Sequence, residues 1–219
     1  MSGICGVLAR PGGPPLPPSG IDAMCRRLAI GATDATSVCA TVSLGPVALG
    51  ASTFGRHQGG VAHISRDGHV VAVAVVGSFY DQDAPRAAVP EHFLARYLEE
   101  GIGFVERIRG EAVFAVWDGR SDTLHLTTDR FRFHSLYVAD LPEQFVFASR
   151  IGAILASPIP FRATLRPEAI VDAVGTSIIP TPATAYREIS KVPPAQRLSH
   201  RAGATTFATY WDIDFRNPR

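Results

Sequence analysis

The chain has 219 residues, of which 46% are hydrophobic, enough for one substantial core or one large domain of two sheets. Its formal net charge is only +1, from 21 basic and 20 acidic residues, so composition favours neither nucleic acid nor an anionic membrane as a partner. The longest apolar run, residues 70–76, is far below the roughly 20 residues that a membrane helix needs.

The first residues and the cysteines indicate the compartment. The start, MSGICGVLAR, lacks the basic segment followed by a long apolar segment that marks a secretory signal. Cys5, Cys25 and Cys39 are an odd number of cysteines, and their spacing is not that of a metal site. We therefore expect a cytoplasmic protein whose cysteines are buried apolar side chains.

The first 76 residues predict several strands and one helix. Ser19 followed by Asp22 is typical of a helix start, after a proline-rich loop. The apolar side chains of this helix share one face: Ile21, Met24, Cys25 and Leu28. Asp67-Gly68 accepts the positive φ of a tight hairpin turn. We expect strands at residues 2–9, 37–43, 46–53, 60–65 and 69–76.

Residues 110–137 are the stretch around which the chain is organised. In residues 110–118 neither alternating set of side chains is strongly polar, so this strand is predicted to be covered on both faces. The following turn contains Gly119, which we expect to take a left-handed conformation. Leu124 and Leu126 form the apolar face of the return strand, which completes a hairpin.

The segments on either side of this hairpin are mixed. Residues 77–89 are polar and broken, and Pro90 then takes the first position of a helix that Gly101 ends. Asp129 and Arg130 follow the hairpin, and we expect this pair to brace the next loop. Further elements are expected as a helical turn at 104–108, strands at 136–139 and 144–148, helices at 151–156 and 167–174, and a last hairpin around 201–203. Strands and helices do not alternate regularly, so the order predicts an α+β sandwich.

A series of short segments, ordered along nearly the whole chain, matches a known family. Residues 1–7, MSGICGV, are similar to Met-Cys-Gly-Ile-x-Gly, and residues 110–118 to Gly-x-Phe-Ala-x-x-Trp-Asp. Further matches lie at residues 47–50, 129–137, 147–149, 165–169, 191–194 and 210–212. The chain thus resembles the N-terminal glutaminase domain of asparagine synthetase-type enzymes, the class II glutamine amidotransferases. The resemblance implies the N-terminal nucleophile (Ntn) hydrolase fold, an αββα sandwich of two mostly antiparallel sheets covered by helices.

The resemblance also implies a chemistry. In this family the N-terminal cysteine attacks the side-chain amide of glutamine, and its own α-amine takes the thiol proton. An oxyanion hole then holds the tetrahedral intermediate. Ser2 stands where that cysteine belongs once Met1 is removed, so it marks a vestigial nucleophile position. A hydroxyl is harder to activate than a thiol, which already carries a few per cent thiolate at neutral pH.

The supporting positions of the family differ as well. Its Asn-Gly-Glu, which supplies oxyanion donors and holds the substrate, falls on Val76, Gly77 and Ser78, so the asparagine donor is missing. The arginine that clamps the substrate carboxylate would align at Thr53, and the aspartate that receives the substrate amine at Val89. Loss of one oxyanion donor alone costs on the order of 10²–10³ in rate. We predict no catalytic residue here, only vestigial oxyanion positions at Val76 and Gly77 and a vestigial pocket at Thr53, Ser78 and Val89.

Two further features have alternative interpretations. Trimming of the first four residues would make Cys5 N-terminal, but a Cys5 buried in a strand is the preferred interpretation. Arg130, Arg132 and His134 stand in the loop where the family has a glycine and Lys-Pro. They could form a small anion site, although a solvated loop is preferred.

Degenerate glutaminase domains of this kind occur in β-lactam synthetases and lasso-peptide macrolactam cyclases, which form amides without ammonia from glutamine. There the following domain adenylates a carboxylate with ATP and magnesium. The ATP-binding Ser-Gly-Gly-x-Asp-Ser of that domain does not occur in these residues. We therefore expect a degenerate glutaminase domain over residues 1–212. Residues 213–219 would be a tail or the start of a linker. No cofactor is expected in this chain, and ATP and Mg²⁺ are expected only in a partner or synthetase domain.

Three functions follow from the resemblance. The first is a non-hydrolytic domain or subunit with a docking role, whose partner is an ATP-binding asparagine synthetase-like domain, in natural-product or peptide (macrolactam) amide formation. The second is a stand-alone binding module for a protein or a small ligand, with a pocket of Thr53, Val76 and Val89 that favours a more apolar ligand. The third is an amidohydrolase that uses Ser2. A homodimer is compatible with each, whereas nucleic acid and membrane partners are not expected.

Overall fold

A computed structural model describes residues 2–17, 19–29, 38–55, 57–80 and 88–216. Its elements, in chain order, are β1 (Gly3–Ala9), α1 (Gly20–Leu28), β2 (Val38–Leu44), β3 (Val47–Thr53), β4 (Gln58–Arg66), β5 (His69–Phe79), α2 (Val89–Glu100), the 3₁₀-helix η2 (Gly101–Arg107), β6 (Gly110–Asp118), β7 (Thr123–Thr128), β8 (Tyr137–Asp140), β9 (Gln144–Ala148), α3 (Ile151–Ile154), α4 (Pro167–Thr176), β10 (Ser190–Lys191), β11 (Gln196–Arg201) and β12 (Ala204–Thr209). Residue 37, where the second predicted strand begins, lies outside the described residues.

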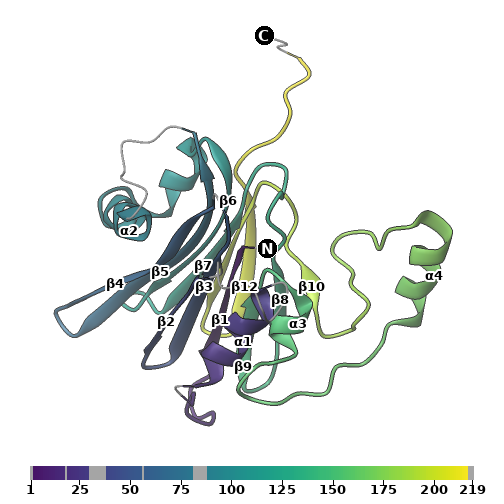
Figure 1. The fold of residues 1–219 in the computed structure, drawn as a ribbon, viewed down its shortest axis with the longest axis horizontal. Helices are drawn as coiled ribbons and strands as arrows, with labels where there is room; N and C mark the ends of the chain where they lie inside the picture. The colour runs from purple at the N-terminus through teal and green to yellow at the C-terminus, as the bar shows by residue number, and fades with distance from the viewer. Residues whose placement is uncertain (1, 18, 30–37, 56, 81–87, 217–219) are drawn as a thin grey trace.

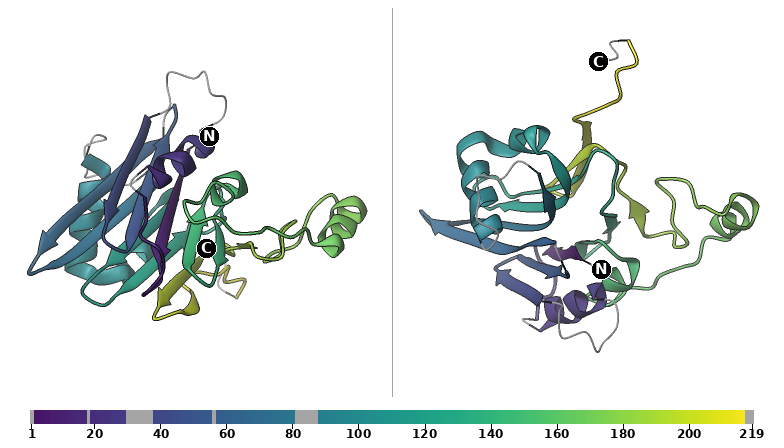
Figure 2. Two further views of the ribbon diagram at one scale, coloured as in Figure 1. Left: turned by 90° about the horizontal axis from the view of Figure 1, so that it is seen from below. Right: turned by 45° about the horizontal axis from the view of Figure 1, so that its top comes forward.

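The elements form four layers, as Figures 1 and 2 show. One six-stranded sheet has the order β10-β8-β9-β1-β3-β2, and the other has the order β12-β11-β7-β6-β5-β4. Every strand pair in both sheets is antiparallel. Helices α1 and α3 pack on the first sheet, and α2 and η2 pack on the second. The predicted α+β sandwich of two antiparallel sheets covered by helices is confirmed.

The protein has three hydrophobic cores, one between the two sheets and one between each sheet and its helices. Because side chains alternate along a strand, successive buried residues face different cores. In β5, Ala72, Ala74 and Val76 face the layer between the two sheets, and the residues between them face α2 and η2. In β6 the same alternation holds, so this strand is buried on both faces, as its sequence predicts. Because neither face of these strands meets water, both alternating sets of side chains are apolar.

Strand β5 is longer than its sequence predicts. Residues 77–79 were expected to lie in a broken segment, but they continue the pairing with β6, where Gly77 is opposite Ala112 and Ser78 is opposite Glu111. A Cβ on Gly77 would lie 2.3 Å from the backbone oxygen of Glu111. The glycine therefore allows a close approach of two strands instead of ending one.

The turn between β6 and β7 corrects another prediction. The residue in the left-handed region is Asp122, with φ of 49°, and not Gly119. A Cβ on Gly119 would lie 2.8 Å from the backbone oxygen of Val70, so a glycine is needed there for space. The hairpins predicted at Asp67-Gly68 and around residue 202 do have positive φ in their turns, as expected.

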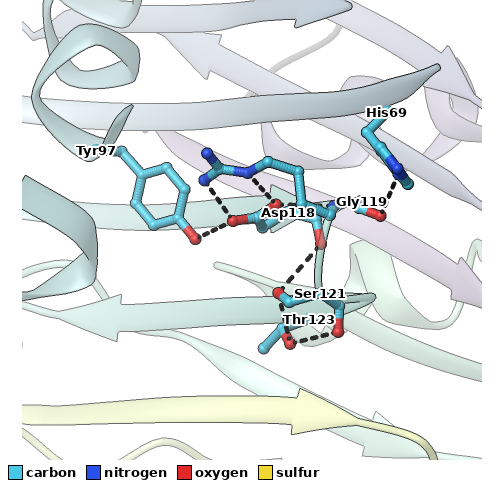
Figure 3. Close-up of polar contacts among 7 residues, drawn as sticks. His69, Tyr97, Asp118, Gly119, Ser121 and Thr123 are labelled. Atoms are coloured by element: carbon cyan, nitrogen blue, oxygen red, sulfur yellow. Dashed lines mark hydrogen bonds and ion pairs between the residues drawn. The ribbon is translucent and has the colours of Figure 1, made fainter. Parts of the chain in front are cut away.

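Strand β6 ends at Asp118, whose carboxylate is buried and hydrogen-bonded (Figure 3). Asp118 accepts hydrogen bonds from the Tyr97 hydroxyl at 2.8 Å and from the Arg120 side chain at 2.9 and 2.7 Å. Burial of Asp118 opposes its ionisation, but the bonds from Arg120 and Tyr97 outweigh burial and lower its pKa to about 2. This charge network joins α2 to the central hairpin.

Helix α4 lies apart from the sandwich, at the end of two extended segments, in all three views (Figures 1 and 2). Its only buried residue is Ala169. Val171 is 71% exposed and Val174 is 83% exposed, and Leu165 and Ile178 on either side are also exposed. The helix thus presents an apolar surface to solvent. No helix among the described residues combines the length and the apolar character that crossing a membrane requires.

Candidate functional site

The vestigial nucleophile position begins strand β1. Ser2 is buried directly before β1, which pairs with β3 on one side and β9 on the other. Its hydroxyl oxygen accepts a hydrogen bond from the Phe54 backbone N–H at 2.8 Å, and the hydroxyl lies 3.4 Å from the Phe54 carbonyl oxygen, to which it donates. The hydroxyl is therefore engaged with the end of β3. Met1, whose removal would free the Ser2 amine, lies outside the described residues.

Ser2 opens onto a cavity of about 1080 Å³. The polar and charged side chains in its wall are Ser2, Arg26, Arg27, His57, Glu111, His134, Ser135, Tyr137, Ser149 and Arg150. They come from α1, β6, the first residue of β8 and the loops beside them, so six separate stretches of sequence meet here. Most of the residues that line the cavity are therefore polar or charged, and they carry more positive than negative charge.

Two histidines share the wall of this cavity. The ring centroids of His57 and His134 are 5.0 Å apart, at an interplanar angle of 70°. His134 is buried, and the burial, together with the nearby His57, lowers its pKa despite the carboxylates of Asp129 and Glu111. His57 Nδ1 is buried and has no hydrogen-bond partner among the described residues. Imidazole nitrogens placed in this way can donate a hydrogen bond to a ligand or accept one from it.

The other vestigial positions do not line this cavity. Val76 has no exposed surface and lies in the core between the sheets, and Val89 is 1% exposed and lies in the core under α2. Thr53 and Ser78 are partly buried at the ends of their strands, where Thr53 pairs with Val38 and Ser78 with Glu111. The predicted pocket of Thr53, Val76 and Val89 is therefore corrected: two of its members are packed in separate hydrophobic cores.

The cysteines do not supply a replacement nucleophile. Cys5 is fully buried in the core between the first sheet and α1, as the preferred interpretation predicts. Cys25 is buried too, and its hydrogen-bond interaction with Cys5 and its desolvation both raise its pKa, because both favour the protonated thiol. Cys39 is exposed, contrary to prediction, yet desolvation raises its pKa to about 11. A thiol with a raised pKa is a weak nucleophile near neutral pH. The described residues contain no group of three side chains able to hold a metal ion.

Asp129 braces the loop after β7 without pairing with Arg130. Its carboxylate accepts hydrogen bonds from the backbone N–H groups of Phe131, Phe133 and His134. Arg130, predicted to pair with it, instead reaches the Glu106 carbonyl and lies 5.6 Å from the Trp211 ring centroid.

The three basic residues of this loop also diverge. Arg132 donates to Thr181 Oγ1 at 3.0 Å, whereas His134 is buried against the cavity. Arg130, Arg132 and His134 therefore form neither a joint anion site nor a fully solvated loop. Sequence reasoning missed Arg26, Arg27 and Arg150, because no motif marks residues at the ends of two helices, distant in sequence, that meet on one sheet.

Comparisons with known proteins agree with this architecture. The chain is 30% identical over 105 residues to asparagine synthetase [glutamine-hydrolyzing] 2 of Bacillus subtilis, an alignment that covers 43% of this chain and 14% of that protein. It is 26% identical over 179 residues to amidase chry2 of Gibberella zeae, covering 76% of this chain and 24% of that protein. The chain thus spans less than a quarter of the length of these curated relatives.

Solved structures show the same fold. The glutamine phosphoribosylpyrophosphate amidotransferase of B. subtilis superposes with a TM-score of 0.56 at 13% identity, covering 95% of this chain and 49% of that one. A family model described as "Glutamine amidotransferase domain" matches residues 85–211, which is more than half of the chain. This match, the two antiparallel sheets and the asparagine synthetase relatives together establish that the chain belongs to the glutamine amidotransferase domain family.

Proposed function

We propose that this chain is a non-hydrolytic glutaminase-like domain or subunit of an asparagine synthetase-like, ATP-dependent amide-forming enzyme, and that its role is structural and docking. One observation carries the proposal. The positions that would hold the oxyanion donor and the substrate amine are Val76 and Val89, both packed in hydrophobic cores at 0% and 1% exposure. Neither side chain has a hydrogen-bonding group, so neither stabilises an oxyanion or a bound amino acid.

The state of Ser2 supports the same proposal. Its oxygen already accepts a hydrogen bond from Phe54 N, which uses one of the lone pairs that a nucleophile offers to a carbonyl carbon. A domain that releases no ammonia would serve an enzyme whose amine is already on the substrate, as in the formation of a macrolactam or another natural-product amide. ATP and Mg²⁺ would then be held by the partner or synthetase domain.

Helix α4 supports the docking role. Val171, Val174 and the neighbouring Ile178 are largely exposed on an arm that projects from the sandwich (Figure 1). Apolar side chains gathered on a projecting element are typical of a protein-binding surface. The partner that fits the family is an ATP-binding asparagine synthetase-like domain, which would cover this arm.

Two measurements test the proposal. Purified chain incubated with glutamine should release no ammonia above the level of its Ser2→Ala variant. Size-exclusion chromatography of native extract should place the polypeptide with an ATP-binding synthetase-like domain, in one chain or in one complex. Ammonia release that disappears in the Ser2→Ala variant would contradict the non-hydrolytic role. Elution as a free polypeptide of 23.4 kDa would contradict docking.

A double variant tests the arm itself. Val171→Asp with Val174→Asp should abolish association with the synthetase-like partner, because two carboxylates would be desolvated in an apolar interface. Ile64→Asp is the matched control, since Ile64 is a partly exposed apolar residue of β4, at 41%. Association that survives the double variant would exclude α4 as the docking element.

The position of Ser2 on a cavity with two histidines favours one alternative, an amidohydrolase that uses Ser2. Such an enzyme would form a covalent adduct at Ser2 with an electrophilic amide, which mass spectrometry of the labelled protein detects. The hydrogen bonds between Ser2 and Phe54 lead us to expect no adduct.

A further inference from the structure

The cavity at Ser2 has a cluster of positive charge that the family's glutamine chemistry does not explain. Arg26 and Arg27 end helix α1, and Arg150 immediately precedes α3, and all three line the cavity. None of them stands at the position of the family's arginine clamp, which is Thr53. We therefore look for a role of these three arginines other than the family's clamp on the carboxylate of glutamine.

Among the described residues, no acidic side chain neutralises these arginines. Arg26 and Arg27 are exposed, and none of the three forms an ion pair with an acidic side chain in the part of the chain that the structure describes. Arg150 makes one contact, from Nη1 to the Leu28 carbonyl oxygen at 3.4 Å. Glu111 is the single acidic residue in the described wall, so three guanidinium groups face one carboxylate. Uncompensated guanidinium groups around a concave site favour carboxylates and phosphates.

The histidines add a second, independent indication of a ligand. His57 Nδ1 is buried without a partner among the described residues, although its ring lines the cavity. A buried polar atom left unpaired destabilises the protein. A ligand with a hydroxyl, carbonyl or amide group near His57 and His134 would satisfy this nitrogen.

We propose that the cavity binds a small organic anion with carboxylate or phosphate groups, whose acidic groups meet Arg26, Arg27 and Arg150 while a polar group reaches His57 and His134. The sequence alone predicted a more apolar ligand, on the assumption that Thr53, Val76 and Val89 line the site. The cavity that the fold builds has a basic and polar wall instead. This site is independent of docking through α4, since the two involve different elements.

Isothermal titration calorimetry with defined probes tests the site. The probes are succinate and 2-oxoglutarate for dicarboxylates, and inorganic phosphate and glycerol 3-phosphate for phosphates, all at constant ionic strength with chloride as the simple-anion control. We expect saturable binding of at least one class, and the class that binds identifies the ligand's acidic group. Absence of saturable binding for all four probes would overturn the proposal.

Variants locate the binding. Arg27→Gln and Arg150→Gln should each weaken binding of the probe about tenfold, which is about 1.4 kcal/mol, because each removes a charge-assisted hydrogen bond to the anion. Arg66→Gln is the charge-matched control, since Arg66 lies on β4 with its side chain 85% exposed and does not line the cavity. Equal weakening in the control would show non-specific charge attraction and refute the site.

The pH dependence gives a readout that a structural role would not alter. The environment of His134 comprises His57, the carboxylates of Asp129 and Glu111, and the cavity. Its pKa is lowered in the free protein, and a bound anion would raise it, so binding takes up a proton. The affinity of the wild-type protein should therefore rise as the pH falls below the ordinary histidine pKa of about 6.5 toward the lowered pKa of His134 in the free protein. Replacement by His134→Gln should remove this rise, and an unchanged pH profile in that variant would refute the contact.

Discussion

Replacing Val76 with asparagine would return the amide that the family's oxyanion hole carries, and we expect the change to destabilise the fold without restoring hydrolysis. Val76 has no exposed surface and lies in the core between the sheets, in the same cluster as Val113 and Ile4. It is opposite Gly59 on one side and Val113 on the other. The new amide would therefore enter an apolar layer.

The size of the effect follows from this burial. Burying a valine side chain contributes about 1.5–3 kcal/mol, and this contribution is lost in the variant. A buried amide without hydrogen-bond partners costs about 1–3 kcal/mol in addition. The sum is about 2.5–6 kcal/mol, which is a large part of the 5–15 kcal/mol of stability that is typical of a domain.

Urea unfolding followed by tryptophan fluorescence, with Val76→Ala as the control, separates the two contributions. The alanine variant loses apolar contacts but adds no polar group, so we expect a loss of about 2–3 kcal/mol in its free energy of unfolding. The asparagine variant should be less stable by a further 1–3 kcal/mol, about the cost of the amide. Equal stability of the two variants, together with ammonia release from glutamine by Val76→Asn, would refute the assignment of this position to the core.

Two further changes test the fold. Asp118→Asn should lower the free energy of unfolding by about 1–2 kcal/mol, a value reduced because half of the Arg120 side chain is exposed and solvent screens the pair. Since folding lowers the pKa of Asp118 from 3.8 to about 2, its contribution is complete above pH 4 and is lost as the pH falls toward 2, which urea midpoints across that range measure. Gly77→Ala should lower the thermal midpoint, because its Cβ would lie 2.3 Å from a strand oxygen, and overpacking of this kind costs about 1–3 kcal/mol. Gly152→Ala, with open space around its Cβ, should leave the midpoint unchanged.

The sequence by itself determined the local structure of much of the chain. Alternating apolar residues and Asp-Gly turns are short-range signals, so strands such as β6 and the hairpin at Asp67 follow from them directly. The ordered motifs were sufficient for the family, and hence for the two-sheet sandwich. The sequence also shows that Ser2 replaces the family's N-terminal cysteine, because the opening motif specifies a cysteine at that position.

Predictions from local sequence were wrong where contact with a neighbouring strand determines the backbone conformation. Residues 77–79 were predicted to belong to a broken segment, yet pairing with β6 carries β5 on to Phe79. Gly119 was predicted to supply a left-handed residue, whereas the close approach of Val70 explains the glycine and Asp122 takes the positive φ. Each of these errors concerns a contact with a residue that is distant in sequence.

Only the tertiary structure decided what the site contains. Val76 and Val89 were read as pocket residues from their alignment, but β5 and α2 direct them into two different cores. The charged wall combines Arg26 of α1 with Arg150 before α3 and His134 after β7, and no sequence pattern relates residues so far apart. Strand period determines which face a side chain occupies, whereas the packing of helices and loops at the sheet ends determines which side chains meet in one cavity.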